Sequence, residues 1–208
     1  MTERLIALRP FHNGRPVRIT GEQLSDEALL AACATGDAVA LGALFDRFHD
    51  AVYRFASRLA RTDELARDDL VQATFLEVCR SAHAFRGTSS VKTWILGIAA
   101  NLARHAVRSE QRRRVHQAKY LERLGAAPAR PDAQIDRRKL FGRIAEALAE
   151  LPREQQVAFI LCDLEQLAGA EVARVLEIPE GTLWRRLHTA RKSMRAALGA
   201  DALELRGE

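Results

Sequence analysis

The chain has 208 residues, of which 48% are hydrophobic, and this suits one or two small domains with apolar cores. The net charge of +5 and the pI of about 9.5 weakly favour a polyanionic partner. Three distant cysteines without CxxC spacing argue against a disulfide framework or a zinc site. No apolar run approaches the ~20 residues of a transmembrane helix, and the N-terminal run is too short for a signal peptide. We therefore expect a cytoplasmic protein with reduced thiols and no direct membrane insertion.

The first 24 residues are rich in arginine and are interrupted by proline and glycine. The breakers are Pro10, Gly14, Pro16 and Gly21. Because such residues end regular helices, we expect residues 1–24 to form a loosely ordered basic arm, with a short extended piece at "PVRIT".

Four helices are predicted over residues 25–114. Ser25 is a suitable N-cap for the first, "SDEALLAACATGD". In the second, residues 38–61, apolar side chains recur at spacings of three and four, which predicts one buried face. A third helix is expected from about Asp63 to Arg80, and a fourth from about Ser90.

Residues 115–138 include "GAAPARPDAQ", a composition typical of an interdomain linker, which we expect to be flexible. A second helical unit is expected over residues 139–199, followed by a tail at 200–208. The fold class predicted is therefore all-α, with two small helical domains.

The end of the second unit has the layout of a helix-turn-helix: a short helix "AGAEVARVLE", a turn "IPE" and a longer helix "GTLWRRLHTARKSMRAAL". One face of the longer helix is apolar and the other is basic. Such a division lets one stripe anchor the helix while arginines and lysines reach DNA. The alternative is a solvated basic face on an ordinary amphipathic helix.

Three segments in this order resemble bacterial RNA polymerase sigma factors of the extracytoplasmic-function (ECF) group. They are "DDLVQATFLEVCR", "AFRGTSSVKTWILGIAANLARHAVRSEQRRR" and "ALAELPREQQVAFILCDLEQLAGAEVARVLEIPEGTLWRRLHTARKSMR". The resemblance covers roughly residues 25–198. It implies that Asp69, Gln72 and Phe75 contact core RNA polymerase, although Ala73 replaces a glutamate that is common in the family. Simple surface polarity is the alternative for Asp69 and Gln72.

The resemblance assigns "FRGTSSVKTW" to the loop that holds a base flipped out of the −10 promoter element. Short hydroxyls suit that task because they reach the Watson–Crick edge of an unstacked base, and Gly87 permits a close backbone approach. The alternatives are helix capping by Ser89 or Ser90 and burial of Trp94. Gly97 shares a helix face with residues that are expected to follow the DNA backbone. The −10 residues implied are Arg86, Thr88, Ser89, Ser90, Lys92, Thr93, Trp94, Asn101, Arg104, Arg108 and Arg112.

The helix-turn-helix resembles the part of the family that reads the −35 element. This chain has Ala168-Gly169 in place of Ser-Tyr, Glu177 in place of the turn glycine, and Trp184 and Thr189 in place of basic residues. A residue other than glycine at 177 is expected to be strained. The −35 residues implied are Thr182, Trp184, Arg185, His188, Thr189, Arg191 and Lys192.

The leading hypothesis is a sigma factor that binds core RNA polymerase and promoter DNA, with an anti-sigma factor as a further partner. The alternatives are a stand-alone helix-turn-helix regulator and a sigma-like decoy that binds polymerase or DNA without opening promoters. The histidines are scattered, and the sequence has no HExxH motif and no Gly-rich phosphate loop after a strand. We therefore expect no metal site, no cofactor and no catalytic residues.

Overall fold

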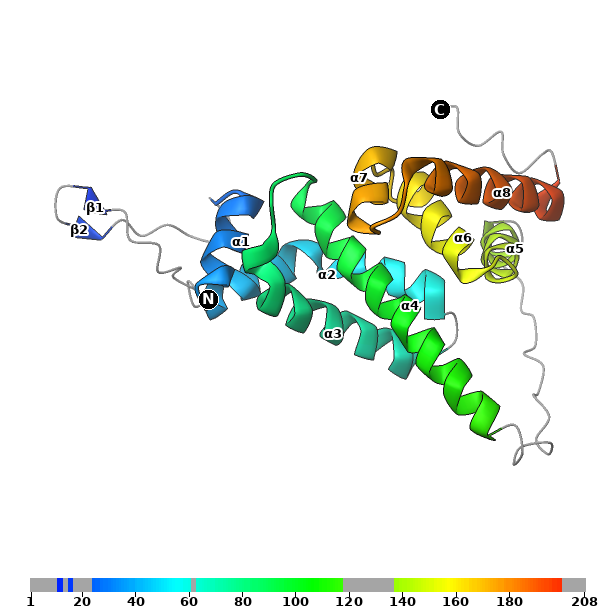
Figure 1. The fold of residues 1–208 in the computed structure, drawn as a ribbon, viewed down its shortest axis with the longest axis horizontal. Coiled ribbons are helices and arrows are strands. Elements are labelled where there is room, and N and C mark those ends of the chain that lie inside the picture. Colours follow the sequence, from blue (N-terminus) through cyan, green and yellow to red (C-terminus); the bar gives the residue numbers. More distant parts are fainter. Residues whose placement is uncertain (1–10, 13–14, 17–23, 61–62, 118–136, 200–208) are drawn as a thin grey trace.

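The computed structural model describes residues 11–12, 15–16, 24–60, 63–117 and 137–199 (Figure 1), without the side chains of residues 11–12, 15–16, 60, 105–117 and 137–141. The predicted linker core at 118–136 and the tail at 200–208 lie outside the described residues. Within the N-terminal arm, β1 (Phe11–His12) and β2 (Arg15–Pro16) form one short antiparallel pair. All other regular elements in the described part of the chain are helical, and the predicted all-α class is confirmed.

The N-terminal domain contains four helices and one short 3₁₀ turn. They are α1 (Asp26–Ala34), α2 (Ala38–Ala60), α3 (Glu64–Ser81), the turn η2 (Ala82–Ala84) and α4 (Val91–Gln117). Ser25 caps α1 as expected, accepting a hydrogen bond from the Ala28 amide at 3.2 Å. Asp63 caps α3 in the same way.

The apolar residues of α2 recur at helical spacing, and this places the helix in the core of the domain. Leu44, Val52 and Phe55 lie on one face of the helix and are fully buried. They join Ile95 and Leu96 of α4 in a single apolar core. The core fixes the start of α4, and with it the loop that precedes this helix.

The C-terminal domain comprises α5 (Arg137–Ala149), α6 (Arg153–Phe159), the π-helical turn η3 (Ile160–Leu164), α7 (Gly169–Val175) and α8 (Glu180–Leu198). The sequence predicts one helix over 153–167, whereas the structure changes at Ile160 to a π turn, closed by a 2.8 Å bond from the Glu165 amide to the Ile160 carbonyl. Helices α7 and α8 form the expected helix-turn-helix.

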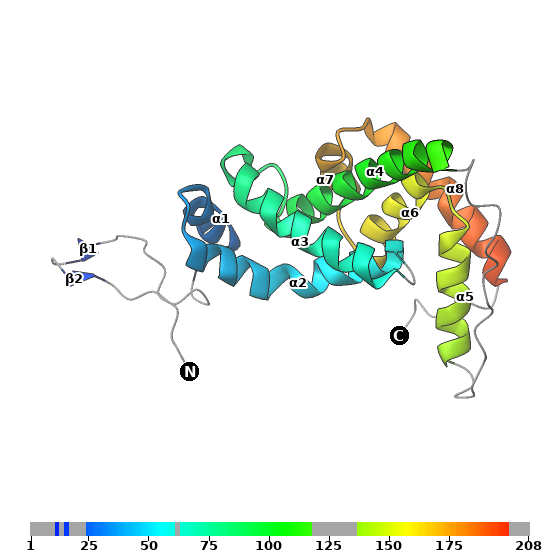
Figure 2. The same cartoon turned by 90° about the horizontal axis from the view of Figure 1, so that it is seen from below.

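The two domains pack against each other. Helices α6 and α7 contact α4, and α5 contacts α2. Figure 1 shows α7 beside α4, and Figure 2, from below, places α1 and α5 at opposite ends of the bundle. No local pattern in the sequence predicts this contact between domains. Among the described residues, no helix is long and apolar enough to cross a bilayer.

Candidate nucleic-acid interface

The loop of residues 85–93, called here the hydroxyl loop, connects η2 to the first turn of α4. Gly87 has a φ of 66°, a left-handed conformation that favours glycine and turns the chain sharply. Ser90 caps α4, because its hydroxyl accepts the Thr93 amide at 3.1 Å. The capping alternative is therefore correct for Ser90.

The hydroxyl loop holds one buried side chain. Thr93 is 1% exposed, and its hydroxyl donates to Glu171 Oε2 of α7 at 2.8 Å while it meets the Ser90 hydroxyl at 2.7 Å. The Ser90 amide donates to the same carboxylate oxygen at 3.2 Å. In this conformation Thr93 is inaccessible to DNA, and Glu171 is hydrogen-bonded to the groups expected to meet a base.

A cavity of about 480 Å³ lies between the hydroxyl loop and α7. Its lining from the N-terminal domain includes Arg86, Thr88, Ser89, Trp94 and Asn101. Trp94 is half-buried and meets the ring of Phe85 edge-on, with a centroid separation of 5.5 Å. The loop thus borders a space with polar and aromatic walls, and α7 supplies its opposite side.

The face of α4 predicted to follow the DNA backbone also contacts the C-terminal domain. Asn101 Nδ2 donates to the Val175 carbonyl at 3.4 Å. Arg104 is half-buried, and its Nε has no hydrogen-bond partner among the described residues. Arg108 and Arg112 belong to α4, but their side chains lie outside the described part.

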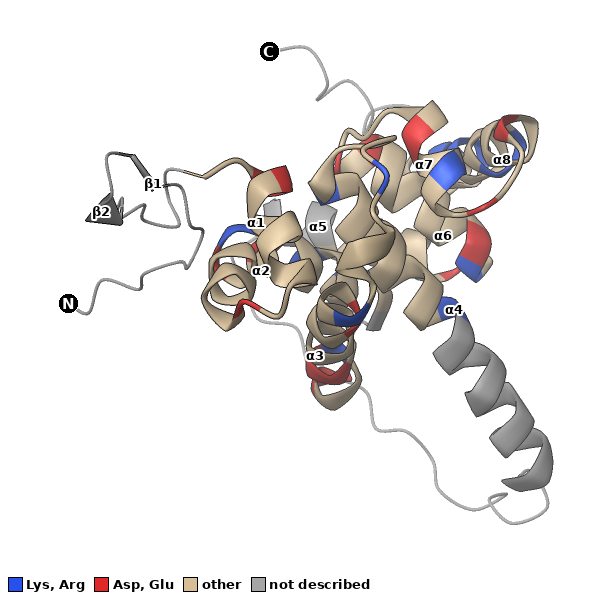
Figure 3. Cartoon of the chain, turned by 60° about the vertical axis from the view of Figure 1, so that its left-hand side comes forward, with Lys and Arg blue, Asp and Glu red and all other residues tan. Residues whose placement is uncertain are grey.

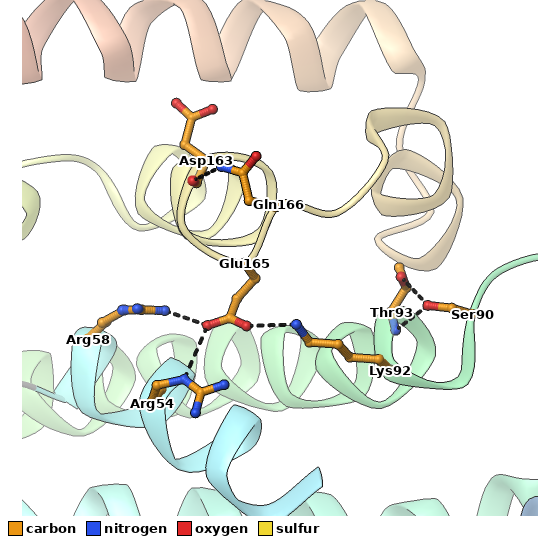
Figure 4. Close-up of polar contacts among 8 residues, drawn as sticks. All are labelled: Arg54, Arg58, Ser90, Lys92, Thr93, Asp163, Glu165 and Gln166. Carbon is orange, nitrogen blue, oxygen red and sulfur yellow. Dashed lines mark hydrogen bonds and ion pairs between the residues drawn. The ribbon is translucent and has the colours of Figure 1, made fainter. Parts of the chain in front are cut away.

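Lys92, one of the residues expected to meet the −10 element, is paired with an acidic residue instead. Its Nζ lies 3.0 Å from Glu165 Oε2, and Arg58 Nη1 lies 2.6 Å from Glu165 Oε1. Arg54 lies within 3.8 Å of the same carboxylate. Figure 4 shows Glu165 pointing from η3 toward these three cations of α2 and α4.

The Glu165 side chain is only 4% exposed, and its environment decides its charge. Burial alone would raise its pKa, but hydrogen bonds and charges from Lys92 and Arg58 outweigh burial and lower the pKa overall. Glu165 is therefore ionised at neutral pH. Arg153 crosses the same interface, and its Nη1 donates to the Leu59 carbonyl at 2.9 Å. Burial disfavours the charged form of its guanidinium and therefore lowers the pKa of Arg153.

Helix α8 carries the exposed basic residues that the sequence predicts, and Figure 3 colours its Lys and Arg positions blue. Its apolar stripe, from Leu183 to Leu198, is buried. The predicted −35 residues that are exposed are Trp184, Arg185, His188, Thr189 and Lys192, and Thr182 is half-buried.

Arg191 differs from its predicted neighbours on α8. It makes two hydrogen bonds to Asp163, at 2.6 and 2.8 Å, and the bond to Asp163 raises the pKa of its guanidinium. This pair attaches α8 to η3. In this conformation Arg191 positions the helix rather than presenting a free guanidinium.

Gly169 and Trp184, two departures from the family pattern, are neighbours in space. A Cβ placed on Gly169 would lie 2.6 Å from the ring of Trp184, so Gly169 provides the room that the indole occupies. Trp184 is 48% exposed and packs its covered side on α7. Glu177 has a φ of 55°, which agrees with the strain expected from the missing glycine.

A second surface is an apolar groove between α2 and α3. Leu76 is 51% exposed there, Phe45 is 39% exposed, and Tyr53 lines the same groove. Phe75 lies beneath Phe45, with a centroid separation of 4.7 Å, and is 5% exposed. Gln72 lines the groove, and Asp69 is exposed on α3.

The predicted site residues do not include Glu165, Glu171 or the exposed apolar residues of this groove. The groove carries a signal, because Leu76 interrupts the polar face of a helix. Glu165 and Glu171 have no such signal in the sequence, because their partners lie in the other domain and each acid resembles an ordinary solvated carboxylate.

Comparison with known proteins adds two family matches. The models described as "Sigma-70 region 2" and "Sigma-70, region 4" match residues 44–113 and 141–194. The chain is 34% identical to the ECF RNA polymerase sigma factor SigM of Mycobacterium tuberculosis, over 84% of this chain and 85% of that protein. It is 28% identical to the ECF RNA polymerase sigma-E factor of Escherichia coli, over 83% and 94% of the two chains.

Two solved structures share the fold. The sigma factor RpoE of Bartonella quintana, in complex with the anti-sigma factor NepR, superposes with a TM-score of 0.60 at 23% identity, covering 76% of this chain and 95% of that one. CnrH, in complex with the cytosolic domain of CnrY, superposes with a TM-score of 0.59, also at 23% identity, covering 85% and 98%.

Proposed function

Because this chain belongs to the ECF family of RNA polymerase sigma factors, we propose that it directs core RNA polymerase to a specific set of promoters by reading their −10 and −35 elements. Its role is promoter-specific transcription initiation. In this proposal its chemistry is recognition rather than catalysis, and its place of action is the cytoplasm, where it meets polymerase and DNA.

One observation carries the division of labour: the chain places a hydroxyl-rich loop at the start of α4 and an exposed basic recognition helix, α8, in separate domains. We assign −10 recognition to the hydroxyl loop and α4. Thr88 and Ser89 are its best candidates for base contact, because Ser90 caps the helix and Thr93 is buried. We assign −35 recognition to α8, where Arg185, His188 and Lys192 are exposed.

We assign core polymerase binding to the groove between α2 and α3. Exposed apolar side chains bordered by polar ones, as Leu76 is by Gln72, are typical of protein interfaces. An anti-sigma factor is a further proposed partner, because the sigma factor RpoE superposes on this chain and was solved with its anti-sigma factor NepR.

Run-off transcription on genomic fragments with purified core polymerase tests the function directly. The wild-type chain should give promoter-specific transcripts, and a decoy would give none. Leu76→Asp should weaken capture of core polymerase by at least about tenfold, because a charge would be desolvated in an apolar interface. Leu65→Asp is the matched control, because Leu65 is 80% exposed on the same helix and does not line the groove. Equal loss from both changes would contradict the docking assignment.

The hydroxyl loop has its own test in the same assay. Thr88→Ala and Ser89→Ala should change the preferred −10 base, since they alter groups expected at the base edge. Arg108→Ala and Arg112→Ala should weaken all promoters similarly and reduce the salt dependence of binding, since they are expected to contact phosphates. Identical behaviour of the two pairs would refute the separate roles.

A further inference from the structure

Two cysteines from distant parts of the sequence meet where α1 packs against α3. Cys33 lies in the last turn of α1, and Cys79 lies in the last turn of α3. Helix α1 contacts both α3 and the turn η2 that follows it. The two side chains are hydrogen-bonded to each other, so their sulfurs already face each other. A disulfide requires this juxtaposition, because cysteines whose side chains diverge cannot be bridged without moving the backbone.

The two thiols differ in their access to solvent. Cys79 is exposed, whereas Cys33 is only 2% exposed and belongs to the apolar core. A small oxidant in solution therefore reaches Cys79 and not Cys33. Redox-active sites generally combine an accessible thiol with a second thiol poised beside it. Cys79 and Cys33 fit this arrangement as the attacking thiol and the resolving thiol.

The protonation of Cys33 sets the order in which the two thiols react. Burial, then the charge of Cys79 and the hydrogen bond to it, raise the pKa of the Cys33 thiol to about 11. Cys33 is therefore protonated at neutral pH and donates to the Cys79 sulfur. Since a thiolate rather than a thiol attacks an oxidant, Cys79 reacts first. Once Cys79 has become a neutral sulfenic acid, its charge no longer opposes the ionisation of Cys33.

Cys162, the third cysteine of the chain, lacks such a partner. It is half-buried in η3, and burial is the main reason why its pKa is raised to about 11. The charged groups that act on it are Asp163 and Arg191, and neither is a thiol. Of the three cysteines, all of which the structure describes, only Cys33 and Cys79 contact another thiol.

We propose that Cys33 and Cys79 form a reversible disulfide when the chain meets a hydroperoxide. The Cys79 thiolate attacks the terminal peroxide oxygen and the O–O bond breaks, so that Cys79 becomes a sulfenic acid and the other oxygen leaves as water or an alcohol after protonation. The Cys33 sulfur then attacks Cys79 Sγ and the S–O bond breaks, and the oxygen leaves as water with the proton of Cys33. In total two electrons pass from the thiols to the peroxide, and a dithiol reductant restores both thiols.

The disulfide joins the two ends of the segment that contains α2 and most of α3. This segment carries the apolar groove with Phe45 and Leu76. A cross-link that closes so long a loop restricts the unfolded chain and thereby stabilises the folded one. Because the thiols are already in contact, oxidation strengthens the N-terminal domain without a large rearrangement. The inference is independent of what the groove binds.

Mass spectrometry of the full chain tests the site. The reduced chain is treated with equimolar hydrogen peroxide, free thiols are blocked with N-ethylmaleimide, and peptides are separated without reduction. We expect the Cys33 and Cys79 peptides to be cross-linked within one chain, Cys162 to carry the maleimide, and dithiothreitol to reverse the cross-link. The Tm of the oxidised chain should exceed that of the reduced chain by at least about 5 °C.

Cys79→Ser is the decisive variant, because Cys79 is exposed and serine is close to it in size. This variant should show neither the cross-link nor the Tm shift. Cys162→Ser is the matched control and should retain both. Cys33→Ser tests the order of the steps, because Cys79 should then accumulate as a sulfenic acid that dimedone labels. Circular dichroism shows whether each variant is folded, and Cys79→Ser decides the outcome if the buried Cys33→Ser does not fold.

Three results would overturn the proposal: no cross-link after peroxide, a cross-link between two chains through Cys79, or a disulfide that involves Cys162. A cross-link without a rise in Tm would overturn the stabilising role. These readouts use the chain without polymerase or DNA. A failure of the proposed function would appear separately, as absent run-off transcripts from a chain that still forms the disulfide.

Discussion

Glu165→Gln removes the charge at the centre of the domain interface while keeping the side-chain shape. The wild-type carboxylate is 4% exposed and lies 2.6 Å from Arg58 and 3.0 Å from Lys92. Loss of one partner of a fully buried pair costs about 3–5 kcal/mol. Here the Arg58 and Lys92 side chains are 30% and 35% exposed, so water partly compensates them when the acid is lost. We expect a loss of about 2 kcal/mol, or about 4–8 °C in Tm for a chain of this size.

The pH dependence of this loss tests its cause. The pKa of Glu165 is lower in the folded chain than its ordinary value of 4.5. Its stabilising contribution is therefore complete above that ordinary value and disappears as the pH falls through the folded pKa. Thermal unfolding followed by circular dichroism should show a constant difference between wild type and variant from about pH 8 to pH 5, and a shrinking difference below about pH 4.

Glu146→Gln is the matched control, because Glu146 is exposed on α5 and forms no ion pair with the described residues. Its effect should stay within about 0.5 kcal/mol at every pH. If Glu165→Gln behaved like this control at neutral pH, or if its cost persisted unchanged in acid, the ion-pair account of the interface would be wrong.

Two further predictions concern strain and thiol reactivity. Glu177→Gly should stabilise the chain by about 1 kcal/mol, measured by urea unfolding, because the residue has a φ of 55°; a destabilised variant would refute the strain argument. At neutral pH, iodoacetamide should modify exposed Cys79 first, because burial raises the pKa of both Cys33 and Cys162 to about 11, two units above the ordinary 9.0, and leaves about a hundredfold less thiolate. Mass spectrometry of the alkylated peptides checks the order, and early modification of Cys162 would contradict it.

Local pattern was sufficient to predict the helices. The cap at Ser25, the apolar spacing along α2 and the basic face of α8 are properties of short segments, and each is found in the structure. The apolar groove between α2 and α3 was only partly predictable, because its shape depends on how Phe45 packs over Phe75.

The domain contact could not be predicted for a different reason. Glu171 and Thr93 lie 78 positions apart, and Glu165 and Arg58 lie 107 apart, so no local pattern relates them. The π turn at Ile160–Leu164 also has no pattern in the sequence that predicts it. Its effect is clear in Figure 4, where Asp163 and Glu165 point to opposite sides of η3, one toward α8 and one toward the N-terminal domain.

Among the departures of the helix-turn-helix from its family pattern, Gly169 and Trp184 together compensate for the cap that Ala168 does not provide. Ala168 provides no side-chain cap for α7, a loss that would weaken an isolated short helix. Gly169, beside it, accommodates the ring of Trp184, which lies within van der Waals distance and covers the start of α7 from α8. Aromatic packing thus stabilises the start of α7, where the capping hydrogen bond is missing. Since the same helix carries Glu171 and Val175 onto α4, this packing also helps to hold the surface that covers the hydroxyl loop.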